Sequence, residues 1–464
     1  MVPTISSLPD ELLTTIIESA VFEAISIDRE TCSECAVIPN NIVVKTLSLV
    51  SHRFCRIAQP LLFYAPRARH DGSDLTYSLN SMAKLRDTLE SRKALCSRVR
   101  VLNIHLTPYT SHEDMEAAEH ILRRLARPNC LKLEAGNWSH TPRGRSLRVA
   151  VIVAASQCLT SVRHVYVGGQ SASLSQILES KWNTLARLDL RHVGVLTFLK
   201  DKAGFGQVFD SASFTALSVR ETMLLPCALE AIVRWPRKLE HFTFIKLKGC
   251  TAALDWNNIL LPIIKHHSST LRTIEICCGI DNTNKDPSFD ANLFPNLTHL
   301  RLRCCEAINV LGPSVTHFTW DLPKKNSYSS TGEIIPDDRE DWSQFGERHE
   351  ARLRGIATAA VAQDAALRAI HIEFHPVNDG REGPNPWNHY NTFSAWYPWE
   401  LMDRVRDEVL RPSGRELTYS EPPFETKEAW QRDFSAAVKQ RENSLKREIA
   451  EAQAQERERR ARGL

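Results

Sequence analysis

The sequence predicts an α/β protein in three parts. An N-terminal three-helix domain (residues 1–66) precedes a solenoid of parallel strands with outer helices and a C-terminal cap (67–422), and a charged helix ends the chain (423–464). Three observations lead to this prediction. Apolar residues recur at helical spacing near the N-terminus, a strand-like apolar motif returns through the middle of the chain, and the last segment alternates acidic and basic residues with few aliphatics.

Three amphipathic stripes make up the N-terminal part. Apolar residues at helical spacing predict a helix over 10–21, and Ser7 with Asp10 fits the capping box that begins such a helix. Two further stripes follow, and Pro60 is expected to kink or restart the last helix. Three short helices bury only a small core, so this part gains stability by docking on a partner.

Three stretches carry a family resemblance. Leu8–Leu13, Leu47–Phe54 and Ala58–Tyr64 together resemble an F-box of the form common in fungal proteins. The resemblance implies binding to the Skp-type adaptor of a cullin–RING (SCF) ubiquitin ligase. The connection Glu23–Ile42 is longer than usual, which suggests a surface loop or weaker adaptor binding. An ordinary N-terminal helical cap is the alternative. The residues that the resemblance implies for adaptor binding are Leu8, Pro9, Glu11, Leu12, Ile16, Leu49, Val50 and Phe54.

The middle of the chain repeats one motif: apolar, two residues, apolar, one residue, apolar. Its last two positions face one side of a short strand, and stacked units bury that side as a parallel sheet. Most intervals are near the roughly 20–29-residue period of leucine-rich repeats, and 297–305 resembles their consensus best. An open α/β sheet of another topology is the alternative. The motifs begin at Val99, Val162, Leu185, Phe214, Leu239, Leu271, Leu297, Val315 and Leu367, with Leu131–Leu133 as a further candidate.

Helix-capable segments separate these strands and should form the outer layer of the solenoid. An aromatic-rich loop at 376–398 is expected to close the end of the core. The predicted helical segments are 75–95, 113–126, 145–157, 255–267, 344–363 and 400–410.

The residues that alternate with the apolar pairs should form the opposite, concave face of the sheet. Many of them are histidine or arginine, and arginine forks suit acidic or phosphorylated segments. A solvated strand face without any ligand is the alternative. The candidates for substrate binding are Arg187, Arg191, Arg220, His299, Arg301 and Arg303.

Catalytic and metal-binding signatures are not found in the sequence. Gly204-x-Gly206 lacks the third glycine and the Lys-Ser/Thr of a phosphate loop, and Cys32-x-x-Cys35 lacks a second ligand pair. The net charge of +3 implies no general affinity for nucleic acid. The longest apolar run, Val149–Ala155, is too short to span a bilayer, and the scattered cysteines are typical of a reducing compartment. We therefore expect no enzyme, cofactor, metal, nucleic acid or membrane partner, and a cytoplasmic or nuclear location.

The resemblance to an F-box protein with irregular leucine-rich repeats covers most of residues 1–375. It implies the substrate-recognition subunit of an SCF-type E3 ubiquitin ligase. The N-terminal helices would bind the adaptor, and through it the cullin–RING ligase, while the repeats would hold an unknown protein substrate. The alternative is a leucine-rich-repeat scaffold or inhibitor that binds proteins without a ligase.

Overall fold

A computed structural model describes most of the secondary structure of the chain. Two compact units are formed by Met1–Leu247 with Asn258–His267 (unit 1) and by Lys248–Asn257 with Ser268–Leu464 (unit 2). The predicted boundaries at residues 66 and 422 stay predictions. The described residues are 8–22, 41–69, 81–106, 110–125, 127–135, 155, 159–169, 183–193, 209–222, 224, 226–245, 259–277, 288–303, 307–322, 345–374, 398–420 and separate positions within 426–458.

Unit 1 begins with a helical bundle, formed by α1 (Asp10–Val21), α3 (Asn41–Ser48), α4 (His52–Ala58) and the 3₁₀ helix η2 (Gln59–Phe63). The predicted helix over 10–21 is confirmed, and Pro60 does restart the last helix as a 3₁₀ turn. Side chains from all three α-helices share one small core. Its buried members are Leu13, Ile17, Val21, Val44 and Ala58.

Asp10 joins the start of α1 to α4. Arg53 Nε donates to Asp10 Oδ1 at 2.7 Å, and Arg56 pairs with the other carboxylate oxygen. Arg53 also donates to the carbonyl of Leu8. The hydrogen bond from Arg53 holds the pKa of Asp10 below its usual range, although partial burial opposes this. The predicted capping box of Ser7 with Asp10 is wrong, because α1 begins at Asp10 itself and its N-cap is Pro9, without a side-chain cap hydrogen bond.

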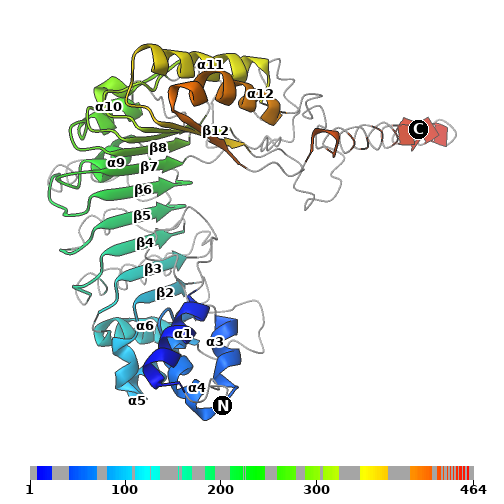
Figure 1. Ribbon diagram of the computed structural model, residues 1–464. Helices are drawn as coiled ribbons and strands as arrows, with labels where there is room; N and C mark the ends of the chain where they lie inside the picture. Colours follow the sequence, from blue (N-terminus) through cyan, green and yellow to red (C-terminus); the bar gives the residue numbers. More distant parts are fainter. Residues whose placement is uncertain are drawn as a thin grey trace. The chain divides into compact units, whose positions relative to one another are not determined.

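The sheet of unit 1 is parallel, and its strands pair in chain order (Figure 1). Leu102, Leu131, Val165, Leu188, Leu217 and Phe242 align in register across it, and all six are buried. These strands confirm the first five predicted motifs and the Leu131–Leu133 candidate. The strands are β1 (Arg67–Arg69), β2 (Val101–Leu106), β3 (Cys130–Ala135), β4 (His164–Gly168), β5 (Arg187–Arg191), β6 (Ala216–Arg220) and β7 (His241–Ile245).

Helices of unit 1 bury their apolar sides. In α6, Ser111 and Asp114 form a reciprocal capping box, and Met115, Ile121 and Leu122 are buried. Helices α9 and α10 contact each other. The predicted segment 145–157 lies outside the described residues except for Ala155, which is helical. The bounds are α5 (Ser81–Ser91), η3 (Lys93–Ser97), α6 (His112–Arg124), α9 (Pro226–Val233) and α10 (Leu261–Lys265).

Three consecutive strands of unit 1 end in a left-handed residue. Gly169, His192 and Glu221 follow β4, β5 and β6 with φ of 113°, 53° and 52°. Each donates its backbone N–H to a carbonyl at the end of the next strand, at 2.9, 3.0 and 2.6 Å, and the acceptors are Arg191, Arg220 and Ile245. The same hydrogen bond therefore ends successive strands.

Unit 2 continues the repeat in a second set of parallel strands, which pair in the order β8, β10, β12, β13 and β14. The remaining predicted motifs correspond to β8, β10, β12 and β13, so they are confirmed as strands. The short β9 and β11 form a separate parallel pair that the motif did not predict. The bounds are β8 (Thr273–Cys277), β9 (Ser288–Asp290), η6 (Ala291–Leu293), β10 (His299–Arg303), β11 (Ala307–Asn309), β12 (His317–Leu322), β13 (Ala369–Phe374) and β14 (Glu416–Tyr419).

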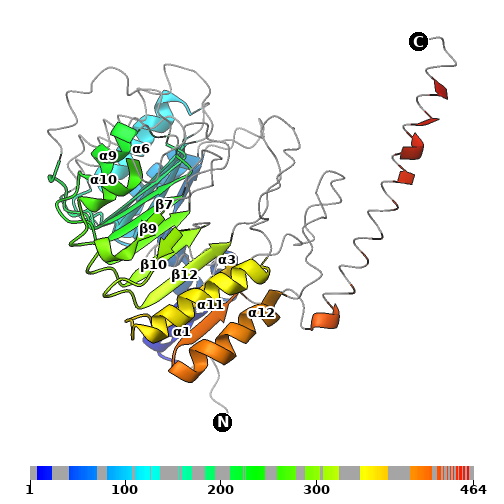
Figure 2. The ribbon, with the colours of Figure 1, turned by 90° about the horizontal axis from the view of Figure 1, so that it is seen from above.

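Helices α11 (Glu347–Ala362) and α12 (Pro398–Val405) lie side by side in unit 2 (Figure 2). Trp320 of β12 is buried, and its ring contacts Phe345 and His349 at the start of α11. The π-helical turn η8 (Arg406–Leu410) and the 3₁₀ turn η9 (Arg411–Ser413) follow α12, in agreement with the predicted helix over 400–410.

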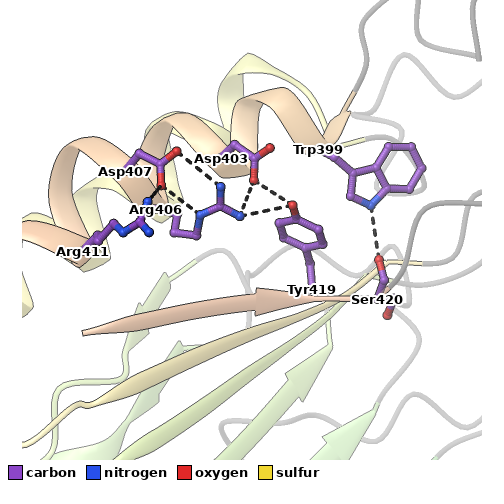
Figure 3. Close-up of polar contacts among 7 residues, drawn as sticks. All are labelled: Trp399, Asp403, Arg406, Asp407, Arg411, Tyr419 and Ser420. Atoms are coloured by element: carbon purple, nitrogen blue, oxygen red, sulfur yellow. Dashed lines mark hydrogen bonds and ion pairs between the residues drawn. The ribbon is translucent and has the colours of Figure 1, made fainter. Parts of the chain in front are cut away.

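The last strand of unit 2 is held to α12 and η8 by polar contacts (Figure 3). Tyr419 donates its hydroxyl hydrogen to Asp403 at 2.7 Å, and Arg406 pairs with the same carboxylate at 2.7 Å. Trp399 Nε1 donates to the carbonyl of Ser420 at 3.2 Å. The aromatic loop expected to close the core lies mostly outside the described residues. The prediction for that loop therefore stays open. Buried residues of α12 and η8 in this part of unit 2 are Trp399, Leu401, Met402, Val405 and Leu410.

The charged tail is helical at its described positions between 427 and 458, which agrees with the predicted charged helix. None of the helices within the described part of the chain is both long and apolar enough to cross a membrane.

Candidate functional site

Helix α1 carries two apolar ridges with opposite environments. Leu13, Ile17 and Val21 are buried in the bundle, whereas Leu12 and Ile16 are 53% and 49% exposed. Leu49 and Val50, in the turn after α3, are 87% and 61% exposed. Single exposed aliphatic residues are common on protein surfaces. These four, together with Ile42 of α3 at 77% exposed, mark the bundle as a candidate for protein binding.

The other four predicted adaptor-binding residues differ in their surroundings. Pro9 and Glu11 are exposed at the start of α1. Leu8 is half-buried beside the Asp10 contacts, and Phe54 packs against the core of the bundle. The structure therefore gives Leu8 and Phe54 internal contacts that a purely surface role would not require. Residues 23–40 of the long connection lie outside the described part, so the prediction for it stays open.

On the polar face of unit 1, four side chains from neighbouring strands form a chain of contacts. Asp189 on β5 lies 2.6 Å from His164 Nε2 on β4 and 3.0 Å from Arg187 Nε. His164 Nδ1 in turn lies 3.7 Å from the Cys130 sulfur on β3. Burial alone would raise the pKa of Asp189, but the hydrogen bond with His164 and the charge of Arg187 outweigh it and hold the pKa below its usual range. This arrangement neutralises Arg187 within the protein.

The order Cys130, His164, Asp189 resembles the thiol, imidazole and carboxylate of nucleophilic sites. The environment of the thiol argues for a different role. Cys130 is 3% exposed and packs with Tyr64, Ala65 and Val101. Because the sulfur is covered by this cluster, we interpret the three residues as a buried polar network in which each group satisfies the next.

Arg191 and Arg220 lie at the end of the same face. Arg191 Nε is 3.1 Å from Glu221, and His192 Nε2 is 2.7 Å from the same carboxylate oxygen. Arg220 Nε donates to Ser218 Oγ at 2.9 Å. Of the three arginines predicted for unit 1, two are therefore already paired with a carboxylate.

Arg301 is the centre of the polar face in unit 2. Its guanidinium lies 3.1 Å from Glu275 on β8, 3.1 Å from Asp321 on β12 and 2.6 Å from Glu373 on β13. Cys277 donates to the same Asp321 oxygen at 3.3 Å. Burial disfavours the charged guanidinium, but Glu275 and Glu373 outweigh this and raise the pKa of Arg301. Three carboxylates therefore already surround Arg301, and its role in substrate binding stays a prediction.

His299 is exposed and stacks on His317 of the next strand, with ring centroids 4.6 Å apart. The backbone of Arg303 pairs with β12, while its side chain lies outside the described part of the chain. The predicted substrate-binding residues thus form one group in unit 1 and one in unit 2. In both groups carboxylates pair with arginines, and around Arg301 they outnumber the cation three to one, where the residue types alone suggested a basic surface.

Sequence analysis missed how the carboxylates pair with these arginines. A usable signal was present, because in-register neighbours on parallel strands face each other: Glu275 pairs with Arg301 in the β8–β10 register. Within the described residues, no group of three or more histidine, cysteine, aspartate or glutamate side chains could hold a metal ion.

Comparison with known proteins gives no assignment: no family model matches the chain, and no curated protein matches it.

Proposed function

We propose that the protein is the substrate-recognition subunit of an SCF-type ubiquitin ligase. In this proposal the helical bundle binds a Skp-type adaptor, and the polar face of the parallel strands binds a target protein. The observation that carries it is the exposed apolar group of Leu12, Ile16, Leu49 and Val50, which the family resemblance had designated for adaptor binding.

Leu12 and Ile16 form a second apolar ridge on α1, which the bundle does not need for its own core. A helix needs only one apolar ridge to complete a small bundle, and Leu13, Ile17 and Val21 supply it. When a partner covers Leu12 and Ile16, each CH₂ group that becomes buried contributes about 0.8 kcal/mol to the free energy of binding. Their exposure supports the proposal, because a docking partner would remove this apolar surface from water.

A polar face on which arginines are already paired with carboxylates suits a target that makes many hydrogen bonds better than one held by a single strong charge. Arg187 and Arg301 are already paired, while the His299–His317 stack is exposed. An exposed histidine pair offers both ring surface and hydrogen-bonding nitrogen atoms to a target.

The test is co-purification of the full chain with a Skp-type adaptor. Leu12→Asp and Ile16→Asp place a charge on the exposed ridge, and we expect each to abolish capture of the adaptor. Ser19→Asp is the matched control, because it adds the same charge to an exposed position of α1. It should leave capture unchanged.

A thermal melt of each variant separates loss of binding from loss of folding. If the wild-type chain captures no adaptor, the ligase proposal fails and a repeat-protein scaffold or inhibitor becomes the better interpretation. Equal capture by Leu12→Asp and wild type would show that the exposed ridge is not the docking surface.

A further inference from the structure

A basic groove lies in unit 1 at the edge of the sheet where the strands begin. Arg100 immediately precedes β2, and Arg163 immediately precedes β4. Arg127 lies two residues before Asn129, which precedes β3. Together with Ser161 and Thr184 these residues line a groove of about 530 Å³. Because adjacent strands are about 4.8 Å apart, the backbones of Arg100 and Arg163 are about 10 Å apart.

The charges of this groove are not balanced within the described part of the chain. No acidic residue is among its described lining residues, and none of the three arginines forms an ion pair with a described residue. Arg127 and Arg163 are exposed, and Arg100 is half-buried. This contrasts with Arg187, Arg191 and Arg301, which all have carboxylate partners.

Hydrogen bonds already position part of the groove. Arg100 Nη1 donates to the carbonyl of Arg127 at 3.5 Å. Ser161 donates its hydroxyl hydrogen to the Pro128 carbonyl at 3.1 Å, and Thr184 donates to the Thr160 carbonyl at 2.6 Å. The donors that remain for a ligand are therefore mainly the guanidinium groups and the Asn129 amide.

We propose that this groove binds a phosphate monoester. Such a group carries a charge of about −1.5 to −2 at neutral pH and accepts the paired hydrogen bonds that guanidinium forks donate. It matches the unbalanced positive charge better than a single carboxylate does. The ester is carried either by a phosphorylated residue of a protein segment or by a small molecule.

Nucleic acid is the less suitable ligand. Binding of single strands relies on aromatic side chains that stack on the bases, and no aromatic residue is among the described residues that line the groove. The proposal does not depend on adaptor binding, because the groove and the exposed ridge of α1 share no residue.

The test is calorimetric titration of the full chain at low salt. The ligands are inorganic phosphate, a phosphoserine peptide, the same peptide without the phosphate, and single-stranded RNA. Arg127→Glu and Arg163→Glu are the diagnostic variants, since both side chains are exposed and their replacement should leave the fold intact. Arg92→Glu, exposed in the same unit but outside the groove, makes the same charge change.

We expect saturable binding of phosphate and of the phosphoserine peptide, weakened at least about tenfold by each diagnostic variant and less than about twofold by Arg92→Glu. A peptide that binds more tightly than free phosphate identifies a protein segment as the carrier. Equal affinities identify a small molecule.

Three results would overturn the proposal. The first is the absence of saturable binding of phosphate and of the phosphoserine peptide. The second is an equal loss of affinity in Arg92→Glu, and the third is tighter binding of RNA with the same dependence on Arg127 and Arg163. The last result would show a general polyanion surface.

Discussion

Replacing Arg301 with methionine should destabilise unit 2, although the residue lies on a face that was expected to bind a substrate. Methionine keeps an unbranched side chain of similar reach but removes the guanidinium. Glu275, Asp321 and Glu373 then lose the cation that lies within 3.1 Å of each of them. Asp321 is only 1% exposed, so water cannot replace the lost contact.

The magnitude follows from the contacts. At an effective dielectric constant of 20, a pair of unit charges 3.1 Å apart attracts by about 5 kcal/mol before desolvation is considered. Most of that attraction is offset by the cost of burying the charges, and removing one partner of a buried pair costs about 3–5 kcal/mol. The Arg301 side chain is 26% exposed, which places the expected loss toward the lower value.

The assay is denaturant unfolding of Arg301→Met, Arg301→Lys and wild type, followed by a probe in unit 2. Lysine keeps the charge but lacks the guanidinium fork that contacts three carboxylates. The free energy of unfolding of Arg301→Lys should therefore lie between those of Arg301→Met and wild type. Arg272→Met is the control, because Arg272 is exposed in the same unit, and its free energy of unfolding should change by less than about 0.5 kcal/mol. If Arg301→Met unfolds at the same denaturant concentration as Arg272→Met, the three carboxylates do not depend on Arg301 and the reasoning is wrong.

Two further predictions concern titration and the C-terminal cap. Burial lowers the pKa of His267 more than the hydrogen bond from His267 to the Val233 carbonyl raises it. The contribution of His267 to stability is therefore present above its unfolded pKa of about 6.5 and declines as the pH falls. Unfolding free energies at pH 7 and pH 5 should differ less in His267→Gln than in wild type; an equal difference would contradict the assignment. Tyr419→Phe removes the hydroxyl donor to Asp403 and should cost about 1 kcal/mol in denaturant unfolding. An unchanged midpoint would show that the contact contributes nothing.

The sequence predicts the parts of this fold that burial makes periodic. Leu188 and Leu190 alternate with polar residues because only one side of β5 meets the core, and Leu13 and Ile17 recur because one ridge of α1 does. The short edge strands β1 and β14 escape prediction, since Arg67–Arg69 and Glu416–Tyr419 do not contain the apolar motif. Nothing in local spacing marks such strands.

The charged parts of the candidate sites were predicted less well. Residue type and strand position placed Arg301 on the polar face. Its ion pairs, however, are formed with side chains from three other strands. Arg100, Arg127 and Arg163 lie just outside the strands, where no burial pattern constrains the residue type. Their convergence depends on the strand register, which a single sequence does not contain.

The left-handed residues that end β4, β5 and β6 have a consequence for how this chain can change over evolutionary time. Each strand end is held by a backbone hydrogen bond to the next strand, independently of the residues that follow. Two of the three positions are His192 and Glu221, which accept a conformation costing about 1–2 kcal/mol for a residue other than glycine. Because these hydrogen bonds use backbone atoms, they hold the strand ends whichever side chains the connecting segments carry. A lineage could therefore alter its loops, and with them its partners, while the strands keep the same register.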